Sequence, residues 1–402
     1  MKIIDYYIIL LMVLGYDYYS RRLVYFKGVS IFDIIFIGYI AVSIISSYKK
    51  REKVFNKFFI VLLVLLFFDL IIGILKDNSF NNIFSDITSI LFYMFIYFVF
   101  YNNKDRYFKD NNIYKIFLVI AIINSFIYIF ININSNNFIF NFFNNRQGLQ
   151  DDIIENGRLF GPDLVFWVPV IYGIFMGKYK HKISLIISLL LIAIPSFILY
   201  KNRQLPIMIL FMIILILLHK AIYTKNPFKT TCMIYIILAI ILSGTIFISK
   251  SSDDRIRNIF SFSQDTSLLY RKYTNDVAME KVKDNFPIGS GLGSTYRFKL
   301  NYNGQSTNQT LVDNFYINLL LRVNFITFIM IIYYLLNMLK QSIKNKESLF
   351  ILLSLLISTP ISTVHITRVQ YAFIIVYIIF NNKYSRSKKI NEKNTNIIKY
   401  SS

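Results

Sequence analysis

The sequence predicts an all-α, polytopic integral membrane protein with about twelve transmembrane helices. Hydrophobic residues make up 55% of its 402 residues and aromatic residues 17%, which is more apolar surface than a soluble fold needs for its core. Apolar stretches close to about 20 residues, the length that crosses the hydrocarbon as a helix, also recur along the whole chain. Short basic patches separate them, as is usual between membrane spans.

The expected spans follow one another with little else between them. The first apolar run, Ile3 to Tyr16, has no small-residue cleavage site after it, so we expect an uncleaved first span. We expect a single membrane domain over residues 1–402, with a polar tail at 383–402. The predicted spans are 3–16, 29–48, 54–75, 83–101, 115–133, 163–177, 183–200, 205–222, 232–249, 314–338, 348–366 and 369–381.

Short basic loops indicate the orientation, because such loops stay in the cytoplasm. With twelve spans, both termini are expected to be cytoplasmic. The long loops 134–162 and 250–313 then face outward, together with the turn at 76–82. The basic segments that fall on the cytoplasmic side are 49–53, 103–115, 178–182, 219–229, 340–346 and the tail from Asn381.

This orientation separates the two basic residue types. Of 30 lysines, 22 fall on the cytoplasmic side, whereas 11 of 14 arginines fall outside or at outer helix ends. Arginine binds phosphate or carboxylate with a planar fork, whereas lysine acts as a hydrated point charge. The set therefore favours a surface that binds an anionic substrate, with outer-loop salt bridges and lipid headgroup contacts as the alternative. The outer arginines are Arg21, Arg22, Arg146, Arg158, Arg203, Arg255, Arg257, Arg271, Arg297, Arg322 and Arg368.

The composition argues against several other functions. The net charge is +22, but the charged residues lie between the predicted spans and form no compact basic domain. We therefore expect no nucleic-acid partner. One cysteine and three widely spaced histidines predict no metal site, and we expect no cofactor. No D-x-D motif occurs, so a glycosyltransferase with this sequence would take a lipid-linked donor.

The loop 250–313 is the longest hydrophilic interval of the chain. Leu268 to Asp284 has the spacing of a short amphipathic helix, which must end before Pro287. Gly289, Gly291 and Gly293 then allow the backbone to turn tightly or to approach a ligand. The G-x-G-x-G pattern lacks the context of a nucleotide-binding motif.

A helix is expected to begin at Asp313, which can act as its N-cap. Asn314, Asn318 and Arg322 follow at four-residue spacing and would form one polar stripe. An arginine this far into a span indicates a wet cavity or an anion partner, with snorkelling to the interface as the alternative.

Three membrane acids, Asp33, Asp69 and Asp86, could be relay residues of a transporter. Each lies nearer an end than the middle of its span, which favours a capping or interfacial placement.

The stretch from Arg271 through NFPIGSGLGSTY to DNFYINLLLR resembles the Wzy_C region shared by O-antigen and capsule polymerases and O-antigen ligases. That region runs from an arginine through an "nPl-GvGlG" turn to an "HN-yl-ll" helix start. The segment KNRQ at 201–204 is similar to the "SR" element that precedes it. The resemblance covers 200–322, and the other spans agree only in number and topology.

The resemblance implies a GT-C-like helical bundle in the bacterial cytoplasmic membrane that polymerises undecaprenyl-diphosphate-linked oligosaccharide units. It implies that Arg203 and Arg271 contact the diphosphate and that Gly289 to Gly293 shape an outer cavity. Asp313 and Asn314 would occupy the "HN" site, where aspartate in place of histidine favours a polymerase over a ligase. Membrane lipids and a chain-length regulator would be its partners.

The residues themselves suit this chemistry. Arginines can stabilise the negative charge of a departing diphosphate without a metal. The acceptor hydroxyl needs a base, for which Asp313 is the best-placed acid and His365 the reserve. Arg146, Arg158, Arg297, Asn314, Asn318 and Arg322 are the further candidates for substrate binding. An O-antigen ligase, a flippase for lipid-linked oligosaccharides and a non-catalytic export component remain alternatives.

Overall fold

The computed structural model describes most of the expected helices and is nearly all α-helical over these residues. The described residues are 3–13, 25–26, 29–49, 57–109, 112–133, 164–179, 204–223, 228, 231–232, 235, 239, 266–299, 306–309, 314–357 and 371–385.

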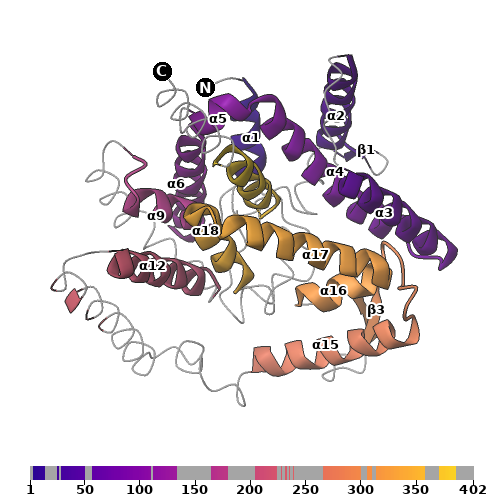
Figure 1. The fold of residues 1–402 in the computed structure, drawn as a ribbon. Helices are drawn as coiled ribbons and strands as arrows, with labels where there is room; N and C mark the ends of the chain where they lie inside the picture. The colour runs from indigo at the N-terminus through magenta and orange to yellow at the C-terminus, as the bar shows by residue number, and fades with distance from the viewer. Residues whose placement is uncertain are drawn as a thin grey trace, which may run out of the picture.

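The helices follow the chain order shown in Figure 1. They are α1 (Ile3–Val13), α2 (Ile31–Lys49), α3 (Lys57–Leu75), α4 (Phe80–Asn102), α5 (Lys104–Lys109), α6 (Asn112–Ile133), α9 (Trp167–Phe175), α12 (Gln204–Tyr223), α15 (Thr266–Asp284), α16 (Phe315–Arg322), α17 (Phe325–Ser342) and α18 (Lys346–Leu356). A further helix covers 371–385.

Two antiparallel hairpins accompany these helices. The strands β1 (Tyr25–Phe26) and β2 (Val29–Ser30) form one pair. The strands β3 (Tyr296–Lys299) and β4 (Ser306–Gln309) form the other, with Tyr296 opposite Gln309.

Most described helices lie where the sequence predicts a span, with two differences. The helix α9 is only nine residues long. The single span predicted over 314–338 is wrong, because the chain leaves helical geometry at Val323 and Asn324 between α16 and α17. The predicted spans 183–200 and 232–249 lie mostly outside the described residues. Two described helices, α4 and α17, are long and apolar enough to cross a membrane.

A bundle of apolar helices forms the main core. Buried side chains from α1, α2, α4, α6, α9, α12, α18 and the helix 371–385 form one continuous cluster. Aromatic rings fill much of it, and Phe100 alone lies within 6.5 Å of the ring centroids of Tyr107, Phe108, Phe373, Tyr377 and Phe380. The buried Trp167 indole donates to Ser125 Oγ at 2.9 Å, so its polar nitrogen is satisfied.

Basic segments that the sequence assigns to one side of the membrane contact each other in the bundle. Glu347, at the start of α18, accepts hydrogen bonds from the hydroxyl groups of Tyr114 and Tyr377. Lys178 Nζ lies 3.8 Å from Glu347 Oε2. Four segments far apart in the sequence therefore meet at one buried carboxylate.

A second, smaller unit lies at the edge of the bundle in Figure 1, where α15 runs alongside α16 and β3. Its core contains Ala278 and Val282 of α15, Tyr296 of β3 and Leu321 of α16. The expected helix in the long loop is thus confirmed, and it ends at Asp284, before Pro287.

The glycine turn, defined as residues 289–293, connects this unit to the bundle. Gly289, Gly291 and Gly293 all have positive φ angles, of 83°, 77° and 75°. A Cβ on Gly291 would lie 2.2 Å from the backbone nitrogen of Gly73 in α3, and a Cβ on Gly293 would lie 2.6 Å from that of Ile83 in α4. The tight turn expected here is confirmed, and what it approaches closely is the backbone of α3 and α4.

This close approach predicts that Gly291→Ala lowers stability by at least about 1–3 kcal/mol, because the left-handed backbone and the overlap with α3 both oppose a side chain. Gly38→Ala is the matched control, since nothing lies within 4 Å of that position in α2. Unfolding of the detergent-solubilised variants by heat or by SDS measures both. Equal midpoints for the two variants would contradict the packing described here.

Candidate functional site

The candidate site is built where the glycine turn meets the connection between α3 and α4. The helix α3 ends in a turn that Asp77 completes with a left-handed φ of 53°. The backbone N–H of Asn78 donates to Gly73 O at 3.1 Å, which is the pairing of a Schellman-type helix end. The side-chain amide of Asn78 then donates to Ser290 O and Leu292 O, both at 2.9 Å. The side chain of Asn78 in the α3–α4 turn therefore binds the carbonyl groups of the glycine turn.

Two acidic residues of the expected membrane spans lie on the helices that flank the α3–α4 turn. They bind the glycine turn and the residue that precedes α17. Asp69 Oδ1 accepts from both the backbone and the side-chain nitrogen of Asn324 at 2.8 Å, and its carbonyl accepts from Leu292 N at 3.0 Å. Asp86 Oδ2 accepts from Gly293 N at 2.7 Å. Both carboxylates therefore bind backbone or side-chain groups of segments more than 200 residues away in the chain.

Arg322 at the end of α16 forms an ion pair with Asp86. Its Nε lies 3.2 and 3.0 Å from the two carboxylate oxygens, and only 6% of the arginine side chain and 14% of the aspartate side chain are exposed. Its NH1 donates to the carbonyl oxygen of Asn318 at 3.2 Å and also to its side-chain oxygen. Of the predicted stripe of Asn314, Asn318 and Arg322, the last two bind each other, whereas Asn314 precedes the helix. A carboxylate of α4 compensates the arginine charge.

The start of α16 corrects one prediction. The N-cap is Asn314 and not Asp313, because Asn314 Oδ1 accepts from Tyr316 N at 3.0 Å and from Ile317 N at 3.2 Å. Asn314 therefore supplies the acceptor that satisfies the first N–H groups of the helix. Asp313 lies outside the described residues.

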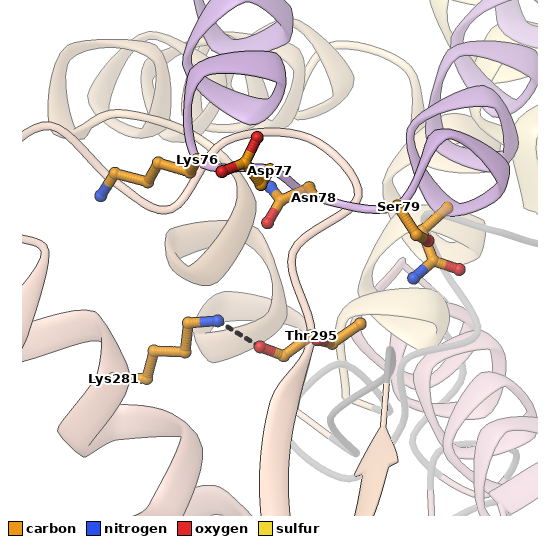
Figure 2. A pocket seen from close by; sticks show the side chains of 7 residues that line it. Lys76, Asp77, Asn78, Ser79, Lys281 and Thr295 are labelled. Carbon is orange, nitrogen blue, oxygen red and sulfur yellow. Dashed lines mark hydrogen bonds between the residues drawn. The ribbon is translucent and has the colours of Figure 1, made fainter.

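A polar cavity of about 530 Å³ opens between the α3–α4 turn and α15. Figure 2 shows the turn residues on one side and Lys281 of α15 reaching toward Thr295 on the other. Lys76 Nζ donates to Gly289 O at 2.9 Å and to the side chain of Asn285. Burial, together with the charge of Lys76, lowers the pKa of Lys281. The residues that line the cavity are Lys76, Asp77, Asn78, Ser79, Asn82, Lys281 and Thr295.

The structure brings some of the predicted site residues together. The three glycines of the turn, Asn318 and Arg322 surround one junction. Arg271 is half-buried on α15, and Arg297 is exposed on β3 opposite Asn308. The other predicted site residues, Asp313, Arg146, Arg158, Arg203 and His365, lie outside the described residues.

Several residues at this junction were not found from the sequence. The backbone of Gly73 lies against the glycine turn, and the side chain of Asn78 binds it, although both residues are more than 200 positions away in the chain. Asn324, which binds Asp69, interrupts a run that is otherwise apolar. The polar run from Asp77 to Ser79 signals a turn between two apolar stretches. Nothing local in the sequence signals the segment against which that turn packs.

Comparison with known proteins gives no further assignment: no protein-family model, no curated protein and no solved structure matches the chain significantly.

The ion pair predicts that Asp86→Asn destabilises the protein by about 3–5 kcal/mol, because a buried arginine loses its partner charge while the shape of the site is kept. The exposed Asp276→Asn on α15 is the control and should change stability by less than about 0.5 kcal/mol. Unfolding midpoints in detergent measure both.

The double variant of Asp86→Asn with Arg322→Gln removes both charges and should cost less than the sum of the single changes. Strictly additive costs would show that the two side chains do not stabilise each other.

Proposed function

We propose that this protein is a metal-independent glycosyltransferase of the Wzy type. It would extend a surface polysaccharide, O-antigen or capsule, on the outer face of a bacterial cytoplasmic membrane. The donor is an oligosaccharide linked to undecaprenyl diphosphate, and the acceptor is the terminal sugar hydroxyl of another lipid-linked unit. The transfer breaks the bond between the donor sugar and the diphosphate and forms a glycosidic bond to the acceptor oxygen. The acceptor proton passes to a base, and the carrier leaves as the diphosphate.

One observation carries the proposal. In the stretch that resembles the Wzy_C region, α15 with Arg271 shares a core with β3 and α16. The glycine turn that connects α15 to β3 packs on α3 and α4, and α16 is joined to α4 by the pair of Arg322 with Asp86. A fortuitous match of short motifs would not require these parts to pack together. The unit gives the arginine, the turn and the helix start fixed relative positions, which a transfer site needs.

The grouping of the loops supports the membrane orientation on which the proposal depends. The turn at 76–79 packs on the long loop that was expected outside. The basic loops expected inside meet one another around Glu347. This sorting is what a chain threaded through a membrane with the proposed sidedness requires, with both termini in the cytoplasm.

The ion pair of Arg322 separates its role from the roles that the Wzy_C resemblance implies for the other arginines. Arg322 has a carboxylate partner in Asp86, so its pairing favours a role in holding the unit together. Diphosphate contact is assigned to Arg203 and Arg271, and the base to Asp313. Arginine suits a diphosphate because two of its N–H groups can meet two phosphate oxygens at once.

Deleting the gene and sizing the glycan on the carrier and on the cell surface tests the function. We expect single repeat units to reach the outer face and to remain unpolymerised, with long chains restored by the wild-type gene. Long chains that stay on the carrier would instead indicate a ligase, and units trapped inside the cell would indicate a flippase.

A second test separates the base from the helix cap at Asp313. Because Asn314 already caps α16, Asp313→Asn should leave the unfolding midpoint unchanged. Removal of a general base should lower the polymerisation rate by about 10²–10⁴-fold in a purified assay with lipid-linked units. Asn314→Ala is the matched control, and it should lower stability by about 0.5–2 kcal/mol through loss of the cap. A wild-type rate in Asp313→Asn would remove Asp313 as the base and direct the test to His365.

A further inference from the structure

The cavity between the α3–α4 turn and α15 has a composition that the proposed transfer chemistry does not explain. Every described residue that lines it is polar or charged, and two of them, Lys76 and Lys281, are lysines from elements about 200 residues apart in the chain. Aromatic side chains, on which sugar rings commonly stack, do not occur among the described lining residues. The cavity volume of about 530 Å³ lies in the range of small-ligand sites.

The two ammonium groups are not compensated within the cavity. Lys76 Nζ donates to Gly289 O and to the amide oxygen of Asn285, and Lys281 Nζ donates to Thr295 O. All three acceptors are neutral, and among the described residues neither lysine forms an ion pair with a carboxylate. Asp77 is the one acidic residue in the described lining, so the lining carries two positive charges against one negative charge.

The two ammonium groups attract an anion into the space between them, Lys76 from an exposed position in the α3–α4 turn and Lys281 from a half-buried position on α15. Burial lowers the pKa of Lys281, and repulsion from the charge of the nearby Lys76 adds to this shift. An anion bound between the two lysines would relieve this repulsion. The amide groups of Asn78 and Asn82 and the hydroxyl groups of Ser79 and Thr295 add hydrogen-bonding groups around the same space.

We infer that this cavity is a binding site for a phosphate or diphosphate group, held between Lys76 and Lys281. Phosphate fits better than a carboxylate, because it offers more acceptor oxygens to donors that converge from several elements. Ser79, the N-cap of α4, makes no capping hydrogen bond with its side chain, so the positive end of a 23-residue helix adds to the attraction. Arg271 is not among the described residues that line this cavity, and the inference does not depend on the proposed glycan transfer.

The phosphate could come from a membrane lipid or from solution, and two probes distinguish these sources. Inorganic pyrophosphate carries the charged group alone, and farnesyl diphosphate carries the same group on a short isoprenoid chain. We expect isothermal titration calorimetry on the full-length protein in detergent to detect binding of farnesyl diphosphate. Equal affinity for pyrophosphate would indicate a soluble ligand, and much weaker affinity would indicate a lipid-borne one.

Variants show whether the probes bind in this cavity. Lys76→Gln and Lys281→Gln should each weaken binding by at least about tenfold, since each removes one charge-assisted contact. Lys283→Gln is the matched control, because Lys283 is exposed on the same helix and does not line the cavity. Asp77→Asn should tighten binding, because it removes the negative charge from the lining.

Unchanged affinity in both lysine variants, or no binding of either probe to the wild-type protein, would overturn the inference. Lysine variants that lose probe binding but still polymerise the glycan would support a phosphate site outside the transfer reaction. Normal probe binding in a protein that does not polymerise any glycan would refute the proposed function alone. The two proposals therefore fail separately.

Discussion

The carboxylate of Asp86 is the contact on which the arrangement of the smaller unit, formed by α15, β3 and α16, depends. It lies on α4 and accepts from Arg322 of α16 and from the backbone N–H of Gly293. An arginine this deeply buried is costly without a partner charge, so α16 is stable in this position only beside α4. The same carboxylate fixes the end of the glycine turn. One carboxylate therefore both compensates the charge of Arg322 and positions the backbone of Gly293.

Asp69 of α3, the preceding helix, likewise binds segments that are distant in the sequence. Its side chain satisfies Asn324 where the chain leaves α16 and enters α17, and its carbonyl satisfies Leu292. Backbone groups freed by a break between two helices would otherwise lack partners in an apolar environment. Asp69 of α3 thus permits an irregular connection between α16 and α17. A charged relay is not needed to explain either residue.

The glycines decide how closely the parts approach. Because Gly73 and Gly291 have no side chains, the turn lies directly against the backbone of α3, and Lys76 and Asn78 reach the carbonyl groups of the turn. The cavity beside this contact exists only because the α3–α4 turn and α15 are held near each other. Its charge therefore follows from the docking of two segments, each of which would be an ordinary polar loop or helix alone.

The sequence alone determined the helical class, the positions of most described helices, the helix ending before Pro287 and the shared face of Asn318 and Arg322. These features depend on local properties: hydrophobic length, residue spacing and the backbone limits of proline and glycine. It did not determine the break at Val323 and Asn324, the cap at Asn314 or the partners of Arg322 and of the glycine turn. An apolar run shows that a helix is favourable, but whether it breaks depends on a hydrogen-bond partner such as Asp69, about 250 residues away. Only the tertiary structure brings such partners together, because long-range pairing of charges and backbone groups leaves no periodic signal in the chain.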